Sequence, residues 1–554
     1  MISGHVDTFC ADRLPPRELW PVRDWSGVPE LAYPERLNCA TELLDRIVES
    51  GKGNRIVFRF PNSDGTLSTW TYRQLLETSN RIAHVLVENL GIVPGNRVLL
   101  RAANTPMLAA CWFGVIKAGG VVVCTMPLLR EREIRYVVDK AEISVALTDV
   151  RVAAECEAVY AGRSGASVIH FGGAEETESR GTTQRARALE SMMRDKPSSF
   201  VNCDTHSEDI AIIAFTSGTT GKGKGTMHSH RDILAITDCF PRYVLEPTED
   251  DVFCGSPPLA FTYALGGLLL FPMRFGASSL LLEQATPPHL LKAIGDYSPT
   301  ICFTSPTAYR AIRGLLGQHK VSSLTKCVSA GETLPLSVFE MWRDATGIRI
   351  IDGIGATEML HIFISASGDD IRPGSTGRVV PGYQAKVIDD EGNDVPVGLI
   401  GRLAVRGPTG CRYLDDVDHQ REYVQNGWNL TGDSYRLDED GYFWYQARTD
   451  DMIISSGYNI AGPEVENVLL EHPAVLECGV VGEPDEERGQ VVKAVIVLRI
   501  GNSGEPALVK ELQDFVKARI APYKYPRRIE FVDSLPRTNT GKLQRYRLRE
   551  NSAS

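Results

Sequence analysis

The stretch Ile210–His228 reads IAIIAFTSGTTGKGKGTMH and joins an apolar segment to a loop dense in glycine, hydroxyl and lysine residues. Its apolar part, 211–215, predicts a buried strand, because short apolar runs bounded by turn residues favour strands. In the loop that follows, glycines permit positive φ and close approach of the backbone. Backbone N–H groups, hydroxyls and ammonium groups can together surround an anion there. The stretch therefore predicts a phosphate-binding loop at the end of a strand.

Two phosphate chemistries compete for this loop. Gly218–Lys224 nearly spells the Walker A pattern G-x-x-x-x-G-K, which would make the chain a P-loop NTPase or nucleotide switch that forms ADP and phosphate. The next Walker residue must be Ser or Thr to bind magnesium, and here it is Gly225. A Walker loop also opens a helix, whereas 225–228 is typical of a return strand. The Walker interpretation fails on both counts.

Apolar runs and helix-length segments alternate around this loop. Thr71–Leu86 has helical spacing, and Thr71 and Gln74 form a capping-box pattern at its start. Short apolar runs follow at 97–100, 120–124, 145–147 and 167–169. Strands separated by helices predict layered α/β structure. The polar stretch 172–199 is expected to lie on the surface rather than in a core.

The pattern of apolar and turn residues changes towards the C-terminus. Alternating segments separated by glycine turns between 381 and 445 indicate a small β-structure. The last hundred residues indicate a compact α+β unit, with helices at 464–470 and 507–519 and strands at 475–481 and 491–498. We therefore predict α/β plus α+β architecture: a large N-terminal domain, 1–449, with layered α/β subdomains at about 1–205 and 206–380 and a small β-barrel-like part at 381–449, and a smaller mobile C-terminal α+β domain, 450–554.

Composition narrows the class of protein. The 554 residues carry a formal charge of −11 without a basic block, so nucleic acid and anionic membrane are not expected as partners. The longest apolar stretch, 107–126, is interrupted by Lys117, and residues 1–13 lack the apolar core of a signal peptide. The twelve cysteines form no C-x-x-C pair. These features predict buried thiols in a reducing compartment and a cytoplasmic protein.

Thr216–Gly225 resembles the first signature of the adenylate-forming superfamily, [ST]-[SG]-G-[ST]-[ST]-G-x-P-K-G. This superfamily includes acyl- and aryl-CoA synthetases, luciferases and the adenylation domains of peptide synthetases. Gly223 replaces the usual proline, which predicts a more mobile loop without loss of a phosphate donor. The resemblance implies that the loop binds the phosphates of ATP through Thr216, Ser217, Gly218, Thr219, Thr220 and Lys224.

A second motif, Asp352–Glu358 (DGIGATE), resembles Y-G-x-T-E. Nucleotide phosphates need a carboxylate that holds Mg²⁺, and Glu358 is the candidate. The resemblance implies that Thr357 hydrogen-bonds the α-phosphate. Ile354 replaces the usual tyrosine, which leaves an apolar contact with adenine in place of ring stacking.

Further nucleotide-binding motifs follow in the expected order. Ser329–Pro335 resembles the segment that lines adenine, Trp428–Asp433 matches W-x-x-T-G-D, and Arg448–Asp451 matches R-x-D-D. The Asp433 carboxylate can accept hydrogen bonds from both ribose hydroxyls. Together with the loop, the nucleotide contacts implied by the resemblance are Gly331, Glu332, Asp352, Gly353, Ile354, Asp433 and Arg448.

The C-terminal motifs concern the second half of the reaction. Ser455–Ile460 matches the glycine loop that approaches the pantetheine thiol, which implies Ser456, Gly457 and Tyr458 in thioester formation. Pro536–Lys542 matches the motif whose lysine, Lys542, reaches both the carboxylate and the α-phosphate. Asp450 is implied as the hinge between the domains. The resemblance extends from Thr71 to Leu543.

These residues imply a reaction. A carboxylate that attacks an α-phosphate meets like charge, so the site must supply positive charge through Mg²⁺, the loop and Lys542. ATP, Mg²⁺ and coenzyme A are the expected cofactors and co-substrates. The mobile domain would first bring Lys542 to the site and then the Gly457 loop.

The resemblance is closest to benzoate- and 2-aminobenzoate-CoA ligases, through Asp352–Ser365 and Pro257–Gly267. It implies an aromatic carboxylate in a pocket of Phe261, Tyr263, Ala264, Ala330, His361 and Ile362. Tyr263 or His361 could hydrogen-bond a ring substituent. Two alternatives stay open at this point: a carrier-protein thiol in place of CoA, and a linear fatty acid in a longer channel.

Overall fold

The glycine-rich stretch begins and ends in paired strands. Its apolar part forms β8 (Ile210–Phe215), and the return strand β9 (Gly225–Ser229) pairs antiparallel with it. A return strand, and not a helix, therefore follows the loop, as the sequence predicts. The computed structural model describes residues 2–62, 64–172, 187–216, 223–448, 451–455, 458–485, 488–520, 522–537 and 543–550.

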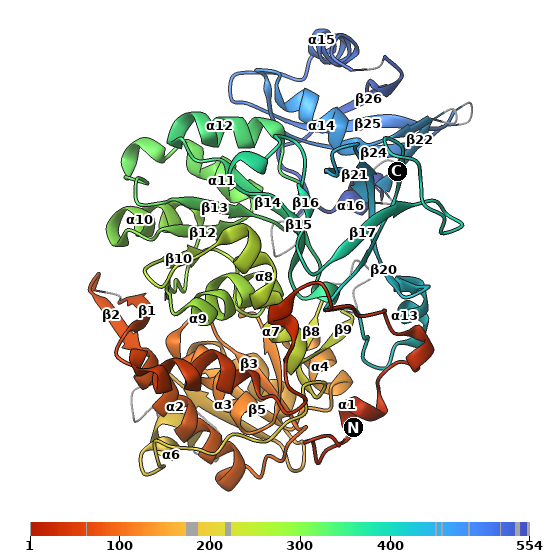
Figure 1. Ribbon diagram of the computed structural model, residues 1–554. Coiled ribbons are helices and arrows are strands. Elements are labelled where there is room, and N and C mark those ends of the chain that lie inside the picture. The colour runs from red at the N-terminus through yellow and green to blue at the C-terminus, as the bar shows by residue number, and fades with distance from the viewer. Residues whose placement is uncertain are drawn as a thin grey trace.

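β8 and β9 are the edge of a seven-stranded sheet in the order β7-β6-β5-β3-β4-β8-β9, which occupies the lower part of the molecule (Figure 1). β3 to β8 run parallel. The other strands of this sheet are β3 (Arg97–Arg101), β4 (Val121–Thr125), β5 (Val145–Asp149), β6 (Ser167–Phe171) and β7 (Arg187–Ala188). The predicted apolar runs at 97–100, 120–124, 145–147 and 167–169 are thus confirmed as strands.

Both faces of this sheet are buried. Val98 and Leu100 contribute to the main hydrophobic core, whereas Leu99, between them, contributes to a second core on the opposite face. This alternation follows from the two-residue period of a strand, and burial on both faces is typical of parallel sheets covered by helices. The helices of this part are α1 (Phe9–Asp12), α2 (Tyr72–His84), α3 (Pro106–Lys117), α4 (Glu131–Lys140), α5 (Ala154–Tyr160) and α6 (Leu189–Met193).

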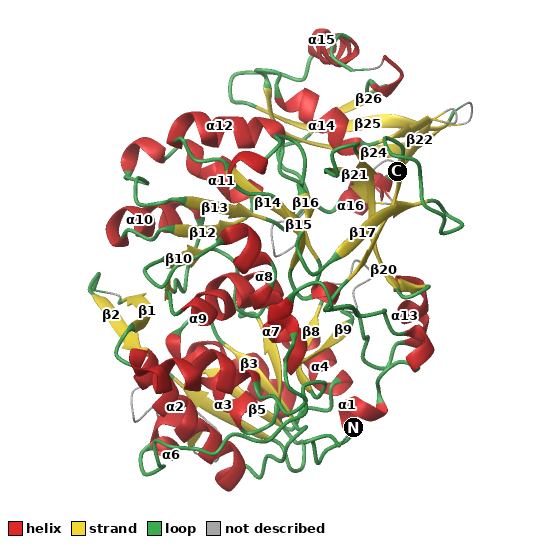
Figure 2. Cartoon of the chain, viewed as in Figure 1, coloured by secondary structure: helices red, strands yellow, loops and turns green. Residues whose placement is uncertain are grey.

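A nine-stranded sheet lies above it, in the order β16-β15-β14-β13-β12-β10-β11-β1-β2. Figure 2 shows its central strands beside helices α10, α11 and α12. The strands are β1 (Ile56–Pro61), β2 (Leu67–Thr71), β10 (Val252–Gly255), β11 (Ser278–Leu280), β12 (Ile301–Thr304), β13 (Lys326–Ser329), β14 (Ile350–Gly355), β15 (Ile362–Ser365) and β16 (Arg378–Val379). The helices are α7 (His230–Asp238), α8 (Thr262–Ala264), α9 (Phe271–Phe275), α10 (Pro287–Tyr297), α11 (Pro306–Arg313) and α12 (Leu336–Thr346). This sheet shares the main core with the seven-stranded one.

A curled five-stranded sheet forms the predicted small β-structure, on the right of Figure 1. Its strands are antiparallel: β17 (Gln384–Ile388), β18 (Ile400–Arg406), β19 (Val424–Gln425), β20 (Trp428–Leu437) and β21 (Phe443–Arg448). A helix that the sequence analysis did not predict, α13 (Val417–Tyr423), precedes β19.

The C-terminal unit is a separate α+β domain with its own hydrophobic core. Its helices are α14 (Gly462–Leu470), α15 (Pro506–Lys517) and α16 (Arg545–Glu550). Its strands are β22 (Ile453–Ser455), β23 (Tyr458–Ile460), β24 (Val475–Asp485), β25 (Gly489–Leu498) and β26 (Arg528–Phe531). The four predicted elements are present, and the sequence analysis missed β22, β23, β26 and α16.

One expectation about the surface was wrong in part. The stretch 172–199 contains α6, whose Leu189 and Met193 are buried in the main core. The surrounding polar residues hid these two apolar positions, which are four apart and therefore share one helix face. Residues 173–186 of this stretch lie outside the described part.

The predicted capping box of α2 is confirmed by reciprocal bonds between Thr71 and Gln74. Among the described residues, no helix is long and apolar enough to cross a membrane. Lys117, which interrupts the apolar run in α3, is buried and pairs with Asp45 at 2.6 Å. All twelve cysteines are free thiols, and ten of them are buried.

Candidate functional site

The base of the glycine-rich loop is closed by its own backbone. The Thr216 N–H donates to the Lys224 carbonyl at 2.9 Å, and the Lys224 N–H donates to the Thr216 hydroxyl oxygen at 3.2 Å. A Cβ on Gly223 would lie 2.4 Å from the Thr216 carbonyl oxygen. This close approach explains a glycine at the position where proline was expected. Ser217, Gly218, Thr219 and Thr220 lie outside the described residues.

Tyr413 lies between the second motif and Lys224, at the C-terminal end of the glycine-rich loop. Glu358 lies in the single turn η10 (Thr357–Met359), and its Oε1 accepts a hydrogen bond of 2.6 Å from the Tyr413 hydroxyl. Lys224 Nζ lies 5.5 Å from the centre of the Tyr413 ring, within the range of a cation–π contact. Burial and the neighbouring Glu358 carboxylate raise the pKa of Tyr413, so its hydroxyl keeps the proton that it donates. The structure thus brings Lys224 and Glu358 to one tyrosine.

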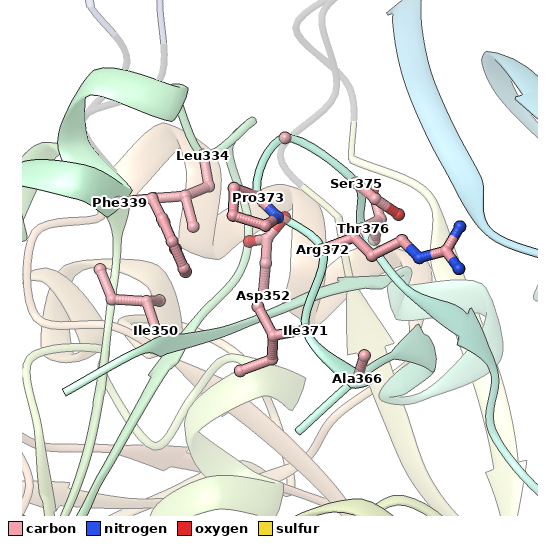
Figure 3. Close-up of a pocket in the computed structure, with 11 residues that line it drawn as sticks. Leu334, Phe339, Ile350, Asp352, Ala366, Ile371, Arg372, Pro373, Ser375 and Thr376 are labelled. Carbon is pink, nitrogen blue, oxygen red and sulfur yellow. The ribbon is translucent and has the colours of Figure 1, made fainter. Parts of the chain in front are cut away.

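Asp352 is a partly buried acid in the middle of β14. Its Oδ1 has no hydrogen-bond partner in the part of the chain that the structure describes. Burial raises the pKa of Asp352 to about 7, although Ser329 on the neighbouring strand and the Gly353 N–H oppose the shift. Figure 3 shows its side chain pointing towards Pro373, while the Arg372 guanidinium points away from it. An acid with one unpaired oxygen is suited to bind a ligand that donates a hydrogen bond.

Asp352 also lies at an open cleft of about 210 Å³ between the large part and the C-terminal domain. The large part contributes Thr333, Leu334, Asp352, Gly374, Thr376, Tyr445 and Gln446, and the C-terminal domain contributes Ala461, Pro463, Glu464 and Asn467. The cleft therefore joins the motif predicted to line adenine with the beginning of α14.

Asp433 and Arg448 face each other across β20 and β21. Arg448 Nη1 lies 3.2 Å from Asp433 Oδ1 and donates to the Thr431 carbonyl at 3.0 Å. Gly432, the residue before Asp433, has φ of +73°, and a Cβ there would lie 2.7 Å from Arg448 Nη2. The glycine of the T-G-D motif thus gives the arginine room to lie across the strand.

Among the residues predicted to line the acyl pocket, His361 is enclosed by aromatic rings. Its ring centre lies 4.5 Å from that of Phe271, 5.8 Å from Tyr263 and 5.9 Å from Phe240. Its Nε2 lies 3.2 Å from the Tyr263 carbonyl oxygen, so Nε2 carries the proton and donates. Burial lowers the pKa of His361 to about 3, which keeps the ring neutral. Nδ1 is therefore an acceptor, and it has no partner among the described residues.

The Tyr263 hydroxyl, unlike His361 Nδ1, has hydrogen-bond partners in the protein. Its hydroxyl lies within hydrogen-bond distance of the backbone carbonyls of Thr304 at 3.3 Å and Val328 at 3.2 Å. Since its one proton already faces carbonyl acceptors, Tyr263 is a poor partner for a further acceptor on a ring substituent. His361, unlike Tyr263, has a polar ring atom without a partner among the described residues.

Two family patterns match most of the chain. Residues 45–412 match the AMP-binding enzyme family, and residues 464–542 match the AMP-binding enzyme C-terminal domain. The chain belongs to the AMP-binding enzyme family. The predicted adenylate-forming resemblance is thereby confirmed, and the protein is an acid–thiol ligase.

Individual relatives of this AMP-binding enzyme point to carboxylic acids and CoA. Benzoate–CoA ligase of Thauera aromatica is 34% identical over 539 residues, which cover 95% of this chain and 99% of that protein. Human mitochondrial acyl-coenzyme A synthetase ACSM3 is 32% identical over 536 residues, covering 94% and 90%. The crystal structure of the anthranilate CoA ligase AuaEII in complex with anthranoyl-AMP has a TM-score of 0.88 at 34% identity, covering 95% and 99%.

The remaining predicted residues of this AMP-binding enzyme have ordinary surroundings. Ala264, Ala330 and Ile362 are buried, and Phe261 is partly exposed. Gly331 has φ of +85°, and Glu332 accepts a 2.6 Å bond from Thr307. Gly353 packs on Ile362, where a Cβ would lie 2.9 Å away, and Ile354 is packed partly buried against the main core. Asp450, Ser456, Gly457, Lys542 and the side chain of Tyr458 lie outside the described part.

Sequence reasoning missed Tyr413, His228, Thr409 and Tyr445. Tyr413, Thr409 and Tyr445 are polar or aromatic residues whose local sequence pattern does not distinguish them from core positions. His228 was the nearest to a signal, because a buried strand that directly follows the glycine-rich loop seldom contains an ionisable residue.

Proposed function

We propose that this AMP-binding enzyme is an ATP-dependent aryl-CoA ligase. It would convert an aromatic carboxylate of the benzoate or 2-aminobenzoate type to an acyl-AMP and then to the CoA thioester, with release of AMP and pyrophosphate. The observation that carries the proposal is the position of His361, buried among Phe240, Tyr263 and Phe271. Rings at these distances form flat apolar walls that suit an aromatic ligand.

The unpaired His361 Nδ1 supports a more specific substrate. A buried acceptor without a partner has lost its bond to water, and a ligand that donates a hydrogen bond recovers it. An amino or hydroxyl group on the ring is such a donor, whereas an unsubstituted ring is not. We therefore favour a 2-aminobenzoate-type acid over benzoate itself.

The nucleotide would lie along the cleft that contains Asp352. Its unpaired Oδ1 is suited to the exocyclic amino group of adenine, and Asp433 is suited to the two ribose hydroxyls. Arg448, held beside Asp433, adds positive charge at this end. The apolar residues Gly353 and Ile354 would line the base.

In the first step, residues of the chain would bring two anions together. Thr216, the loop that follows it and Lys224 would bind the phosphates, and Thr357 would orient the α-phosphate. The Glu358 carboxylate fits Mg²⁺, a hard cation that prefers oxygen ligands and supplies positive charge on the phosphates. Lys542 would contact both the acid and the α-phosphate, which stabilises charge in the in-line displacement.

In the second step the CoA thiol would displace AMP from the acyl carbon. We propose that the C-terminal domain turns at Asp450, at the boundary between 1–449 and 450–554, and presents Ser456, Gly457 and Tyr458 to the thiol. CoA as the acceptor is supported by the relatives benzoate–CoA ligase, acyl-coenzyme A synthetase ACSM3 and anthranilate CoA ligase. The free thiols of all twelve cysteines support a cytoplasmic location.

The test is a panel of acids assayed by AMP release with saturating ATP, Mg²⁺ and CoA. Benzoate, 2-aminobenzoate, 2-hydroxybenzoate and hexanoate are compared by kcat/KM. We expect the aromatic acids to exceed hexanoate by at least about tenfold, the discrimination that one or two apolar groups supply in a pocket. A preference for hexanoate would contradict the aryl assignment.

A further inference from the structure

The turn Thr357–Met359, which carries Glu358, sits next to a strained residue. Leu360 directly after the turn has φ of +71°, a region that L residues other than glycine seldom adopt. Leu360 is fully buried in the main core. A backbone in such a conformation persists only where the surrounding structure determines it. The neighbours of the turn therefore decide where the Glu358 carboxylate points.

Three side chains from outside the turn hydrogen-bond three successive residues in it. His228 Nε2 donates to the Thr357 carbonyl at 2.7 Å, and the Thr409 hydroxyl donates to the Met359 carbonyl at 2.8 Å. Between them, the Tyr413 hydroxyl donates to Glu358 Oε1 at 2.6 Å. We call His228, Thr409 and Tyr413 the turn clamp.

The protonation of His228 is fixed by its surroundings. Burial lowers the pKa of His228 to about 4, so the ring is neutral and carries one proton. Because Nε2 faces a carbonyl oxygen, the proton must lie on Nε2. His228 therefore acts as a donor to the turn throughout the neutral pH range.

Water cannot replace these bonds. The residues of the turn clamp are between 0% and 1% exposed. Loss of one donor would leave a carbonyl or a carboxylate oxygen with an unmet bond, and the penalty is larger when the group is charged. Of the three bonds, the one to the Glu358 carboxylate is therefore expected to matter most.

Tyr413 is itself held in place by buried contacts. Its N–H donates to Gln420 Oε1 at 2.9 Å, and it bridges antiparallel to Thr226 of β9. The neighbouring Leu414 N–H donates to the Gly225 carbonyl at 2.8 Å. The stretch around Tyr413 thus continues alongside β9, the strand that returns from the glycine-rich loop.

Arg412, the residue before Tyr413, is anchored as well. Arg412 and Arg23 both pair with the buried Asp232 carboxylate, whose pKa is raised by burial but lowered more by these two arginines, to about 2. Asp232 belongs to α7, which follows β9 directly. Arg412 and Tyr413 are neighbours, and Tyr413 hydrogen-bonds Glu358. Through Asp232, this segment is linked to α7, which follows the return strand of the phosphate-binding loop.

We propose that Tyr413 is a positioning residue that fixes the orientation of the Glu358 carboxylate. His228 and Thr409 hold the backbone on either side of Glu358. The Tyr413 hydroxyl restrains rotation of the Glu358 carboxylate. Loss of that hydroxyl leaves the turn in place but releases the carboxylate. The proposal rests on the proposed function, in which Glu358 holds Mg²⁺ on ATP.

The experiment compares Tyr413→Phe with Tyr423→Phe in the full-length protein. The Tyr423 ring lies 5.8 Å from that of Tyr413, and its hydroxyl has no partner among the described residues. Each variant loses one phenolic oxygen, on one of two neighbouring rings, but only Tyr413→Phe loses a bond to Glu358. Binding of ATP is measured calorimetrically, once with Mg²⁺ and once with EDTA.

We expect Tyr413→Phe to weaken binding of ATP with Mg²⁺ about ten- to a hundredfold, the range for a hydrogen bond to a charged group. Binding of metal-free ATP should stay unchanged, and Tyr423→Phe should change neither. In a Glu358→Gln background, Tyr413→Phe should add no further loss. Equal weakening with and without metal would contradict the proposal, as would a full effect in the Glu358→Gln background. A wild-type protein that binds no nucleotide would instead contradict the proposed function.

Discussion

Glu358 and His361 lie three residues apart and are treated oppositely by the fold. The turn around Glu358 is hydrogen-bonded by His228, Thr409 and Tyr413. His361 has one donor bond, to the Tyr263 carbonyl, and its other nitrogen is buried without a partner among the described residues. The Glu358 carboxylate is held by a donor from the protein, whereas His361 has an unpaired acceptor to which the proposed substrate would donate.

The difference suggests how one hairpin can serve two substrates. The carboxylate would act on phosphate charge that is common to all adenylation reactions, so a fixed geometry suits it. His361 would select among aromatic acids through its unpaired Nδ1. A ligand without a hydrogen-bond donor would leave this nitrogen unpaired, which gives specificity. Substitutions at Glu358 and His361 should separate these two roles.

Glu358→Gln should remove the carboxylate charge while the hydrogen bonds to the turn backbone remain. We expect the rate of acyl-AMP formation to fall about 10²- to 10³-fold, as when one preorganised electrostatic group is lost. The KM for the aromatic acid should stay unchanged, because His361 is untouched. Pyrophosphate release, measured at saturating CoA, checks the rate. A large change in the acid KM would break the separation of the two roles.

His361→Gln should have a smaller, substrate-dependent effect. A glutamine amide can donate to the Tyr263 carbonyl in place of Nε2 but offers no acceptor at the position of Nδ1. We expect kcat/KM for 2-aminobenzoate to fall about five- to tenfold relative to that for benzoate, the range for one neutral hydrogen bond. His361→Asn, whose oxygen takes the place of Nδ1, is the matched control and should keep the selectivity. An unchanged ratio in the glutamine variant would sink the role given to Nδ1.

Asp352 should make nucleotide binding depend on pH. Its pKa of about 7 means that the carboxylate is protonated progressively below pH 7, and an adenine amino group binds the ionised form better. Affinity for ATP should therefore fall towards pH 6, by at most about tenfold for one pH unit. The ratio of wild-type affinity to that of Asp352→Asn removes the titration of ATP itself. A ratio that does not change between pH 6 and 8 would contradict the contact.

The smallest expected effect concerns stability. Burial lowers the pKa of His361 to about 3 from its usual value near 6.5, so the unfolded chain binds a proton first as pH falls. The stability that the neutral histidine contributes is complete above pH 6.5 and is lost at lower pH. Between pH 7 and pH 5.5 the wild type should lose about 1 kcal/mol more than His361→Gln. Urea unfolding at the two pH values measures it, and parallel losses would show that His361 is not buried as described.

The sequence predicts the parts of this molecule whose chemistry is local. Strands β3 to β6 are visible as short apolar runs, and α2 is visible from its capping residues. The residues Gly225–Ser229 predict the return strand β9. This strand excludes a Walker A loop, because a Walker A loop is followed by a helix. The nucleotide motifs can be predicted because their glycines and carboxylates occur at fixed spacing within short stretches of sequence.

What the sequence does not predict depends on distant contacts. Tyr413 lies 55 residues from Glu358 along the chain, and no local pattern links them. The sequence likewise does not predict that the Tyr263 hydroxyl, in α8, faces the backbone carbonyls of Thr304 in β12 and Val328 in β13. The burial of Leu189 and Met193 likewise depends on which element covers α6, and polar neighbours hide it in the sequence.

The most direct test of the account follows one oxygen atom. An aromatic acid with ¹⁸O in its carboxylate is converted with ATP and CoA, and the AMP product is analysed by mass spectrometry. If the carboxylate attacks the α-phosphate and the thiol then breaks the acyl C–O bond, one ¹⁸O atom must appear in AMP. Label in inorganic phosphate, with ADP as the nucleotide product, or AMP without label would contradict the account.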